Sequence, residues 1–383
     1  MDHLPRHGDG EALSNLPRWD DGTWPGLPRL DGPVAADVCV IGLGGSGLTA
    51  VHELLDLGQR VVAVDAGIVA GGAAGRNGGF LLAGPADFHH DAVATHGRER
   101  ATALYRRTLT EMDRMTAETP GAIRREGSLR IAESPEELDD CRAQLAAMHA
   151  DGLPAAWHRG PDGEGLLIPT DGVFHPLQRC RALAEGAVAR GARLYEQSAA
   201  IEITGQGVLT VEGSVLCNAV IVAVDGRLES VLPELAGRVR TARLQMIATT
   251  PTDEIRTRFA VYSRYGYEYW QQLDDGSVLL GGMRDRGGEG EWTDIAEPAE
   301  PVQSLLDTHL RERLRVTASI THRWAGAVGY TPDGLPIFEE VRPRVWAIGG
   351  YSGTGNVVGA ICGRAVAQMV VQGSAPDAAL FRA

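Results

Sequence analysis

Three glycines and one aspartate near the start of the sequence have the types and spacing to bind a phosphate-linked ligand. Gly42, Gly44 and Gly47 fit the pattern G-x-G-x-x-G, and Asp65 ends the next apolar run. The first glycine allows a tight turn, the second lets a pyrophosphate approach the backbone, and the third lets a helix pack on a strand. The carboxylate of Asp65 can accept hydrogen bonds from ribose hydroxyls and would repel a 2′-phosphate. These residues predict a dinucleotide site and leave open whether the ligand is NAD or FAD.

A strand, a helix and a second strand are expected to position these residues. Residues 38–41 are apolar, as in a parallel strand that is buried on both faces. A helix that begins near Ser46 carries its leucines on one stripe and ends at Gly58, and residues 60–64 form the second strand. The N-terminus of this helix presents free N–H groups and the positive end of the helix dipole, which favours a phosphate.

A second glycine-rich turn lies near the end of the chain. The apolar strand 344–348 leads into Gly349-Gly350-Tyr351-Ser352-Gly353-Thr354-Gly355-Asn356, and a helix is expected over 357–371. One long ligand contacted from both ends of the chain favours FAD, because a helix N-terminus stabilises the negative charge of a reduced isoalloxazine. An NAD site rarely needs the last helix.

The composition excludes several classes of partner. The sequence has 383 residues, a formal net charge of −14, and no lysine among its 36 basic side chains. This balance disfavours nucleic acid and anionic membranes and leaves small molecules as partners, and Schiff-base chemistry on a lysine is excluded. The five cysteines form no C-x-x-C pair, and neither a signal region nor a membrane-spanning run is found, so we expect a cytoplasmic protein without a metal site.

The rest of the chain predicts an α/β composite fold, in which a Rossmann-like FAD-binding domain is joined to a substrate domain with a mixed or antiparallel sheet. Residues 240–250 and 262–282 show an alternating apolar and polar pattern and are rich in aromatics. This pattern indicates hairpins that form a wall of the substrate site. Residues 70–84 are expected to form a glycine-dense loop, and 91–116 one long helix. Further helices are expected at 135–149, 172–190 and 298–314, and strands at 126–132, 193–195, 200–203, 208–211 and 218–224.

The domain boundaries follow from this order of elements. Residues 1–33 are expected to form an irregular arm whose second half, with Trp19 and Trp24, packs against the body. Both domains are expected to be discontinuous. The FAD-binding domain takes residues 34–90, 172–235 and 342–383, and the substrate domain takes residues 91–171 and 236–341.

Four motifs outside the nucleotide site carry a family resemblance. They are Ala74-Gly75-Arg76-Asn77-Gly78-Gly79, Trp324 with Gly326, Thr331-Pro332-Asp333-Gly334-Leu335-Pro336, and Gly350-Tyr351-Ser352-Gly353-x-Gly355. With the nucleotide site they resemble the FAD-dependent amine oxidoreductases of the D-amino acid oxidase superfamily, from about Trp19 to Gly373. The arm and the G-R-N-G-G loop are most similar to the gamma-glutamylputrescine oxidase and glycine and sarcosine oxidase groups.

The resemblance implies an oxidase that acts on the C–N bond of a primary or secondary amine or of an N-substituted amino acid. The carbon bearing the amine would give hydride to flavin N5, the imine would hydrolyse, and O2 or another acceptor would reoxidise the flavin. The residues implied to bind FAD are Gly42, Gly44, Gly45, Ser46, Gly47, Asp65 and Ala66 at the ADP half, Arg76, Asn77, Gly78, Gly79 and Gly326 along the flavin, and Gly350, Tyr351, Gly353, Thr354, Gly355 and Asn356 at its pyrimidine edge.

Three positions depart from the family pattern. Sarcosine oxidases carry a flavin-linked cysteine where this chain has Gly326, which implies noncovalent FAD. The lysine that those enzymes use toward oxygen is absent, so either an arginine or histidine replaces it or the enzyme is a dehydrogenase. The arginine with which glycine and D-amino acid oxidases clamp a carboxylate is missing from residues 326–330, and Arg243 or Arg264 could replace it from the other sheet.

Tyr267, Tyr269 and His89 are the residues predicted to meet the substrate. The two tyrosines share a face of the expected strand, and an aromatic wall attracts an amine by cation–π interaction, although packing is the alternative role. His89 could act as a base, with a pair of surface histidines, His89 and His90, as the alternative. No base is required if the amine binds unprotonated.

Other interpretations stay open at this point. Val224-Asp225-Gly226-Arg227 is similar to the internal aspartate-glycine motif of flavin-dependent aromatic hydroxylases, although the C-terminal Gly349-Gly350-Tyr351 lacks the glycine-aspartate pair typical of that class. Glycine or D-amino acid oxidase proper, an NAD dehydrogenase and a flavin-retaining binding protein without activity are the remaining alternatives.

Overall fold

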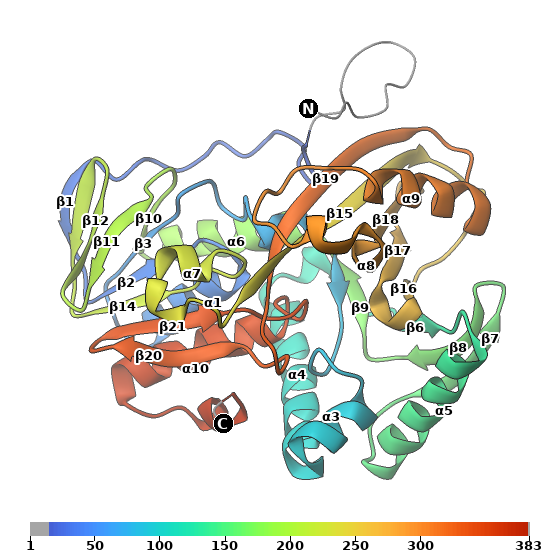
Figure 1. The fold of residues 1–383 in the computed structure, drawn as a ribbon. Coiled ribbons are helices and arrows are strands. Elements are labelled where there is room, and N and C mark those ends of the chain that lie inside the picture. The colour runs from blue at the N-terminus through green and yellow to red at the C-terminus, as the bar shows by residue number, and fades with distance from the viewer. Residues whose placement is uncertain (1–14, 382–383) are drawn as a thin grey trace.

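A six-stranded sheet forms the centre of the nucleotide-binding half in the computed structural model, which describes residues 15–381 (Figure 1). Its order is β10 (Arg193–Tyr195), β3 (Val61–Val64), β2 (Val38–Ile41), β14 (Ala219–Val222), β21 (Val345–Gly349) and β20 (Ile337–Arg342). All neighbours are parallel except β20, which runs antiparallel to β21. The strand residues of β2, β3, β14 and β21 are buried throughout, as expected for strands covered on both faces.

Helices cover one face of this sheet and a small second sheet covers the other. Alternate strand residues such as Val40 and Ile221 pack against α1 (Gly45–Asp56), α6 (Pro176–Ala189) and α10 (Val358–Gln372). The intervening residues contact a four-stranded sheet and the short helix α7 (Leu228–Val231). The small sheet has the order β1 (Gly32–Ala35), β13 (Gly213–Leu216), β12 (Gly207–Thr210) and β11 (Ala200–Thr204).

An eight-stranded mixed sheet forms the other half of the molecule, on the right in Figure 1. Its order is β19 (Ile320–Tyr330), β15 (Arg240–Pro251), β18 (Ser277–Gly282), β17 (Glu268–Gln272), β16 (Ala260–Ser263), β6 (Ser128–Ile131), β8 (Gly163–Ile168) and β7 (Ala156–Gly160). All pairs are antiparallel except β16 with β6. The helix α9 (Val302–Thr308) packs its apolar residues on one face of the sheet.

The remaining elements are further helices, a small sheet and single helical turns. The helices are α2 (Ala73–Arg76), α3 (His89–His96), α4 (Arg98–Glu118), α5 (Pro135–Ala150) and α8 (Arg284–Gly287), and a three-stranded sheet joins β4 (Phe80–Leu81), β9 (Gly172–Phe174) and β5 (Ile123–Arg124). Single helical turns are η1 (Pro120–Ala122), η2 (Pro233–Leu235), η3 (Arg264–Gly266), η4 (Gly288–Glu291), η5 (His309–Arg313) and η6 (Pro376–Leu380).

The structure corrects several expected boundaries. The single helix expected over 91–116 is two helices, α3 and α4, because Gly97 between them has a φ of +82°. The loop expected over 70–84 contains α2 and β4, and the helix expected from Gly172 begins at Pro176, after strand β9. The pairing strands β1 and β13 were not expected, because neither run is long or strongly apolar.

The described part of the arm is irregular as far as β1. Strand β1 then pairs with β13 in the four-stranded sheet. Its second half packs on the body: Trp19 is buried and donates to the carbonyl of Asn77, and Trp24 donates to Glu196. The first 14 residues of the predicted arm lie outside the described residues. Strand β20 begins inside the range assigned to the substrate domain but pairs in the six-stranded sheet, and the division into two domains stays a prediction.

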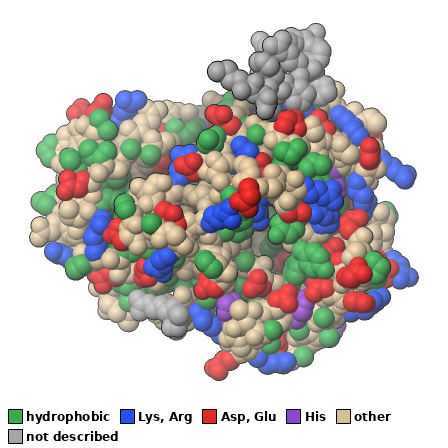
Figure 2. Space-filling model, viewed as in Figure 1, with side chains coloured by type: hydrophobic (Ala, Val, Ile, Leu, Met, Phe, Trp, Pro, Cys, Tyr) green, Lys and Arg blue, Asp and Glu red, His purple; other side chains and the backbone are tan. Residues whose placement is uncertain are grey.

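None of the described helices is both long and apolar enough to cross a membrane. Acidic and arginine side chains are interspersed on the face in Figure 2.

Candidate active site

The first glycine motif lies where β2 ends and α1 begins, at the carboxyl edge of the parallel sheet. Gly42 has a φ of +108°, and a Cβ there would lie 2.5 Å from the carbonyl oxygen of Ala223. A Cβ on Gly47 would lie 1.9 Å from the carbonyl oxygen of Gly42. The first and third glycines are therefore demanded by packing alone. Gly44 differs, since its Cβ would come no closer than 3.4 Å to Ala74, so packing leaves room there for a ligand.

Asp65 follows β3 at the same edge of the sheet. One carboxylate oxygen accepts from the N–H of Leu43 and the other from the N–H of Gly67, both at 2.7 Å. Burial raises the pKa of Asp65 above its ordinary value, while these two N–H bonds oppose the shift. The acid therefore fixes the turn after β2, and each oxygen keeps a lone pair for a hydroxyl of a ligand.

Glu196 supports the same edge and was not expected from the sequence. It is buried, and its carboxylate accepts from the N–H of Val69 at 2.6 Å, from Trp24 Nε1 at 2.8 Å and from the N–H of Leu27 at 2.8 Å. The residue follows β10 directly, and acids at strand ends were the signal that could have found it.

Asp225 gives the aspartate-glycine segment a role in the fold. Its carboxylate accepts from the N–H of Tyr351 at 3.0 Å and from that of Gly329 at 3.1 Å, so it joins the end of β14 to β19 and to the turn after β21. Burial raises its pKa to about 6. Because the segment has this structural role, it gives no separate support to a hydroxylase.

The G-R-N-G-G loop is fixed to the C-terminal glycine turn. Asn77 Oδ1 accepts from the N–H of Gly79 at 2.8 Å and from Asn356 Nδ2 at 3.3 Å, and Asn356 Nδ2 also donates to the carbonyl of Phe80 at 2.9 Å. The two asparagines are 279 residues apart. The structure thus brings together the two segments that were predicted to line one ligand.

Arg76 lies between this loop and β19. Its Nε donates to the carbonyl of Ala325, and its Nη2 donates to Asn15, and both of these acceptors are neutral. Burial lowers the pKa of Arg76, although it stays protonated. Trp324 is fully buried and donates from Nε1 to the carbonyl of Arg76 at 2.8 Å. A Cβ on Gly326 would lie 3.4 Å from Arg76 Cβ, so a larger side chain would crowd this contact.

The C-terminal turn presents a helix N-terminus. Gly350 and Gly353 have φ angles of +66° and +92°, and α10 begins without a side-chain cap or an acidic residue in its first turn. Thr354 Oγ1 is used within the turn, where it donates to the carbonyl of Tyr351 at 2.8 Å. The ring of Tyr351 is buried beneath Gly355, whose Cβ would lie 3.0 Å from it.

One cavity of about 1510 Å³ connects these segments, which exceeds the roughly 300–1,000 Å³ of ordinary small-molecule pockets. Of the predicted cofactor residues it is lined by Gly42, Gly44, Gly45, Ser46, Asp65, Ala66, Arg76, Asn77, Gly78, Gly326, Tyr351, Gly353, Thr354, Gly355 and Asn356. Gly47, Gly79 and Gly350 do not line it. Backbone contacts explain Gly47 and Gly79 instead, since a Cβ on Gly79 would lie 2.5 Å from the carbonyl oxygen of Phe174, and Gly350 has a φ of +66°.

Tyr269 and Tyr267 line the opposite part of the cavity. The ring of Tyr269 lies against Gly78 and Gly281, where a Cβ would come within 3.2 Å and 2.4 Å of it, and burial raises its pKa above the ordinary value. The exposed fraction of Tyr267 is 38%, and the guanidinium of Arg284 lies 5.6 Å from its ring centroid. One face of Tyr267 is therefore already occupied by a cation of the protein.

His89 also lines the cavity, but it is not a surface residue as the alternative interpretation had it. Its side chain is buried, and Nε2 lies 2.7 Å from Asp151 Oδ2. Its ring packs edge to face on Tyr105, with centroids 5.6 Å apart. The histidine is thus held by an acid at one nitrogen, and Nδ1 has no partner among the described residues.

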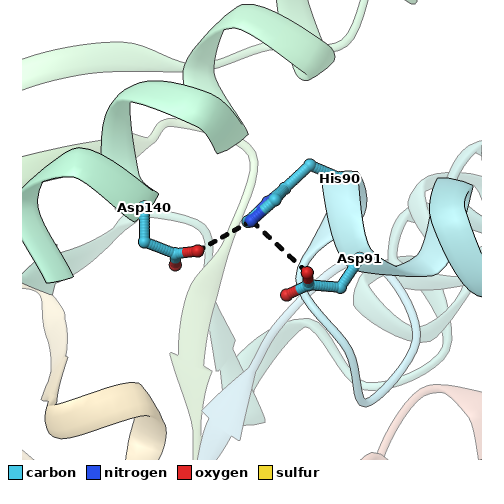
Figure 3. Close-up of side chains that lie close together, drawn as sticks. All are labelled: His90, Asp91 and Asp140. Carbon is cyan, nitrogen blue, oxygen red and sulfur yellow. Dashed lines mark hydrogen bonds and ion pairs between the residues drawn. The ribbon is translucent and has the colours of Figure 1, made fainter. Parts of the chain in front are cut away.

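His90 points away toward α5 and is held between two acids (Figure 3). Its Nε2 lies 2.8 Å from Asp140 and 3.5 Å from Asp91. These three groups lie close enough together for a metal ion, but Arg130 already pairs with the other oxygen of Asp140, and its charge opposes a cation.

Neither of the arginines considered for a carboxylate clamp lines the cavity. Arg243 is buried in a bidentate pair with Glu291, and Arg264 pairs with Glu268 at 2.9 Å and with Asp285. The cavity is instead lined by Arg284, which was not predicted. It lies two residues after the expected hairpin over 262–282, and the end of that hairpin was the signal that could have found it.

Comparison with known proteins decides the family. The model of the family described as FAD dependent oxidoreductase matches residues 37–369. The chain belongs to this FAD-dependent oxidoreductase family. It is 27% identical to the probable oxidoreductase OrdL of Rhizobium meliloti, over 91% of this chain and 86% of that protein. It is 26% identical to the gamma-glutamylputrescine oxidoreductase of Escherichia coli, over 89% and 85% of the two chains. The structure of glycine oxidase from Geobacillus kaustophilus shares the fold, with a TM-score of 0.74 and 19% identity over 89% of this chain and 96% of that one.

The residues present fit FAD. Helices α1 and α10 both begin at the cavity without a side-chain cap and without an acidic residue that would repel a phosphate or a flavin anion. A Cβ on Gly45 would meet nothing within 4 Å, so the space in front of α1 is open. The cavity is continuous from this helix to the tyrosines, which suits a ligand as long as FAD.

Proposed function

We propose that this chain is an FAD-dependent amine oxidoreductase that oxidises the C–N bond of a primary or secondary amine or of an N-substituted amino acid. The observation that carries the proposal is the single cavity that runs from Gly44 and Asp65 to Tyr269, because it gives the cofactor and the substrate one shared space. The names of the gamma-glutamylputrescine oxidoreductase and of the glycine oxidase point to the same class of reaction.

The roles proposed for the cofactor residues follow from their positions. Gly44, Gly45 and Ser46 would hold the pyrophosphate at the N-terminus of α1, and Asp65 would hold the ribose. The G-R-N-G-G loop and the turn from Gly353 to Asn356 would hold the ring system from two sides. When bound, FAD supplies an acceptor for the hydride that leaves the carbon next to the nitrogen.

Tyr269 would form the wall against which the reacting carbon lies. It sits directly on Gly78 of the loop proposed to hold the flavin, so a substrate beside this ring would also lie beside the cofactor. The buried surroundings that raise the pKa of Tyr269 also disfavour an ammonium ion, so the amine would bind in its neutral, reactive form. The reaction then needs no base from His89, whose Nε2 is engaged by Asp151.

We also propose that O2 or another acceptor takes the electrons, and that the protein works in the cytoplasm. All five cysteines are free and buried, an arrangement suited to a reducing compartment. With no lysine in the chain, any cation that assists oxygen must be an arginine or a histidine.

The test is an anaerobic titration of the purified yellow protein with polyamines, their glutamyl conjugates, sarcosine and other N-alkyl glycines, and D- and L-amino acids. We expect one class to bleach the flavin absorbance, and admitting air then measures the rate of reoxidation by O2. Titration with NADPH is the control. Bleaching by NADPH but by none of the amines would overturn the proposal in favour of a hydroxylase.

A further inference from the structure

The described part of the arm lines the cavity and contacts both halves of the molecule. It runs from beside β19 to β1 along the top of Figure 1. Residues 15–17 and Asp20 line the cavity. Asp20 pairs with Arg181 of the nucleotide-binding half at 2.9 Å, and Arg18 pairs with Asp275 of the other half at 2.6 Å. The arm is therefore part of the wall of the site.

Asn15 joins the arm to three other segments at this wall. Its Nδ2 donates to the carbonyl of Ala296 at 2.6 Å. Its Oδ1 accepts from the N–H of Ala325 in β19 at 3.2 Å and from Nη2 of Arg76. The backbone carbonyl of Asn15 also accepts from Nη2 of Arg76, at 2.7 Å. Both ends of the amide are thus in use, which fixes its oxygen toward the guanidinium.

The charge of Arg76 has no acidic partner in the described part of the chain. Among residues 15–381, its nitrogens bond to the backbone carbonyls of Ala325 and Asn15 and to the amide oxygen of Asn15, and no carboxylate lies within 4.0 Å of them. Burial lowers the pKa of Arg76, but an arginine stays protonated at neutral pH. Because Arg76 is partly buried, its charge acts on neighbouring groups more strongly than it would in water.

The arm also holds the backbone of the loop that carries Arg76. Trp19 donates from Nε1 to the carbonyl of Asn77, the next residue, at 2.8 Å. The ring of Trp19 lies against Gly79, where a Cβ would come within 2.9 Å of it. The arm therefore fixes both the G-R-N-G-G loop and the side chain of its arginine, and Arg76 lines the cavity.

A fixed positive charge beside a flavin stabilises the reduced, anionic cofactor and so raises its reduction potential. A carboxylate at position 15 could accept the same hydrogen bonds, but it would offset the charge of Arg76. An amide fixes the guanidinium and leaves its charge in place.

We propose that Asn15 is a positioning residue that holds the guanidinium of Arg76 toward the flavin through neutral acceptors, and that the arm thereby raises the reduction potential of the cofactor. This inference rests on the proposed function, because that function places the ring system at the loop that contains Arg76.

The experiment measures the ratio of reduced to oxidised flavin in the holoenzyme at equilibrium with a reference dye, without any amine. Asn15→Asp keeps the shape of the side chain and gives Arg76 a charged acceptor, whereas Asn15→Ala removes the side-chain acceptor without adding charge. Leu16→Asp is the matched control, because it adds the same charge at the adjacent, exposed side chain of the arm. Limited digestion with trypsin, followed by mass spectrometry, reports cleavage after Arg18 and so shows whether the arm stays docked.

We expect Asn15→Asp to shift the ratio toward oxidised flavin at least tenfold, which is about 30 mV for a two-electron couple. Asn15→Ala should shift it about threefold, and Leu16→Asp less than about twofold, because water screens an exposed charge.

An unchanged ratio in Asn15→Asp or in Asn15→Ala would overturn the inference. Equal shifts in these two variants, or a shift in Leu16→Asp as large as that in Asn15→Asp, would overturn it as well. So would faster cleavage after Arg18 in Asn15→Asp than in Asn15→Ala, because the larger shift would then come from release of the arm. A failure of the proposed function would show separately, as a flavin that no amine bleaches in a protein whose potential still responds to Asn15→Asp.

Discussion

The three glycines of the first motif offer a test that separates folding from ligand binding. A methyl group on Gly47 would lie 1.9 Å from the carbonyl oxygen of Gly42, so Gly47→Ala forces α1 away from β2. A methyl group on Gly44 would lie 3.4 Å from Ala74, which is an ordinary contact, so Gly44→Ala leaves the fold intact. It would nevertheless project into the space proposed for the pyrophosphate. Gly45→Ala is the control, because it adds a methyl group to the same turn where no protein atom lies within 4 Å.

The magnitudes follow from these distances. Overpacking of a tight contact costs about 1–3 kcal/mol, and at about 2.1 cal/mol/K of unfolding entropy per residue this lowers the Tm of a 383-residue chain by roughly 1–4 °C. Loss of one charge-assisted hydrogen bond to the pyrophosphate is worth about 1.5–3 kcal/mol, so Gly44→Ala should weaken FAD binding by roughly 10- to 100-fold.

The assay is thermal unfolding of each apoprotein with and without added FAD. Gly47→Ala should lower the Tm in both conditions, whereas Gly44→Ala should match the wild type without FAD and show a smaller rise on adding FAD. Gly45→Ala should match the wild type without FAD. If Gly44→Ala lowered the Tm of the apoprotein as far as Gly47→Ala, or bound FAD as the wild type does, the separation of the two roles would be refuted.

Two further changes test buried groups. Burial raises the pKa of Asp171 to about 7, so its contribution to stability is fully present below its unfolded pKa near 4 and is lost as the pH rises through 7. Asp171→Asn keeps an acceptor for the N–H of Ala83 and can donate to Ser128, and we expect the fall in Tm between pH 5 and pH 8 to become smaller. A fall equal to that of the wild type would contradict the assigned pKa. Trp324→Phe leaves the carbonyl of Arg76 without its donor, which costs about 1–3 kcal/mol and should increase flavin loss on dialysis; unchanged retention would show that this bond does not hold the loop.

The nucleotide-binding strands could be predicted because their physical signals are local. Residues 38–41 and 61–64 are uniformly apolar, and Gly42 and Gly47 of the first motif are required by contacts with backbone carbonyls. The C-terminal turn was predicted from its own run of glycines after an apolar strand. Residues of this turn and of the first motif line the same cavity. The FAD-dependent family was likewise predicted, from its motifs, and is confirmed.

The parts that sequence alone could not supply depend on partners far away in the chain. His89 is buried because it contacts Asp151 and Tyr105. No local sequence pattern reveals these two contacts. The pairing of Arg243 with Glu291 removed a clamp that the sequence had left open, and the position of Arg284 at the cavity is visible only in the folded chain. Short pairing strands such as β1 carried too few apolar residues to be recognised.

The bond between Asn77 and Asn356 sets the order in which the molecule can mature. Because these residues are 279 positions apart, a nascent chain cannot close the loop around its ligand until nearly all of it has been synthesised. Closing so large a loop is entropically unfavourable, and a ligand that touches both ends adds stability only to chains that have reached their last helix. If FAD binds between these two segments as proposed, a fragment that ends before Gly350 lacks one side of the site, and only chains that have reached the last helix would retain the cofactor.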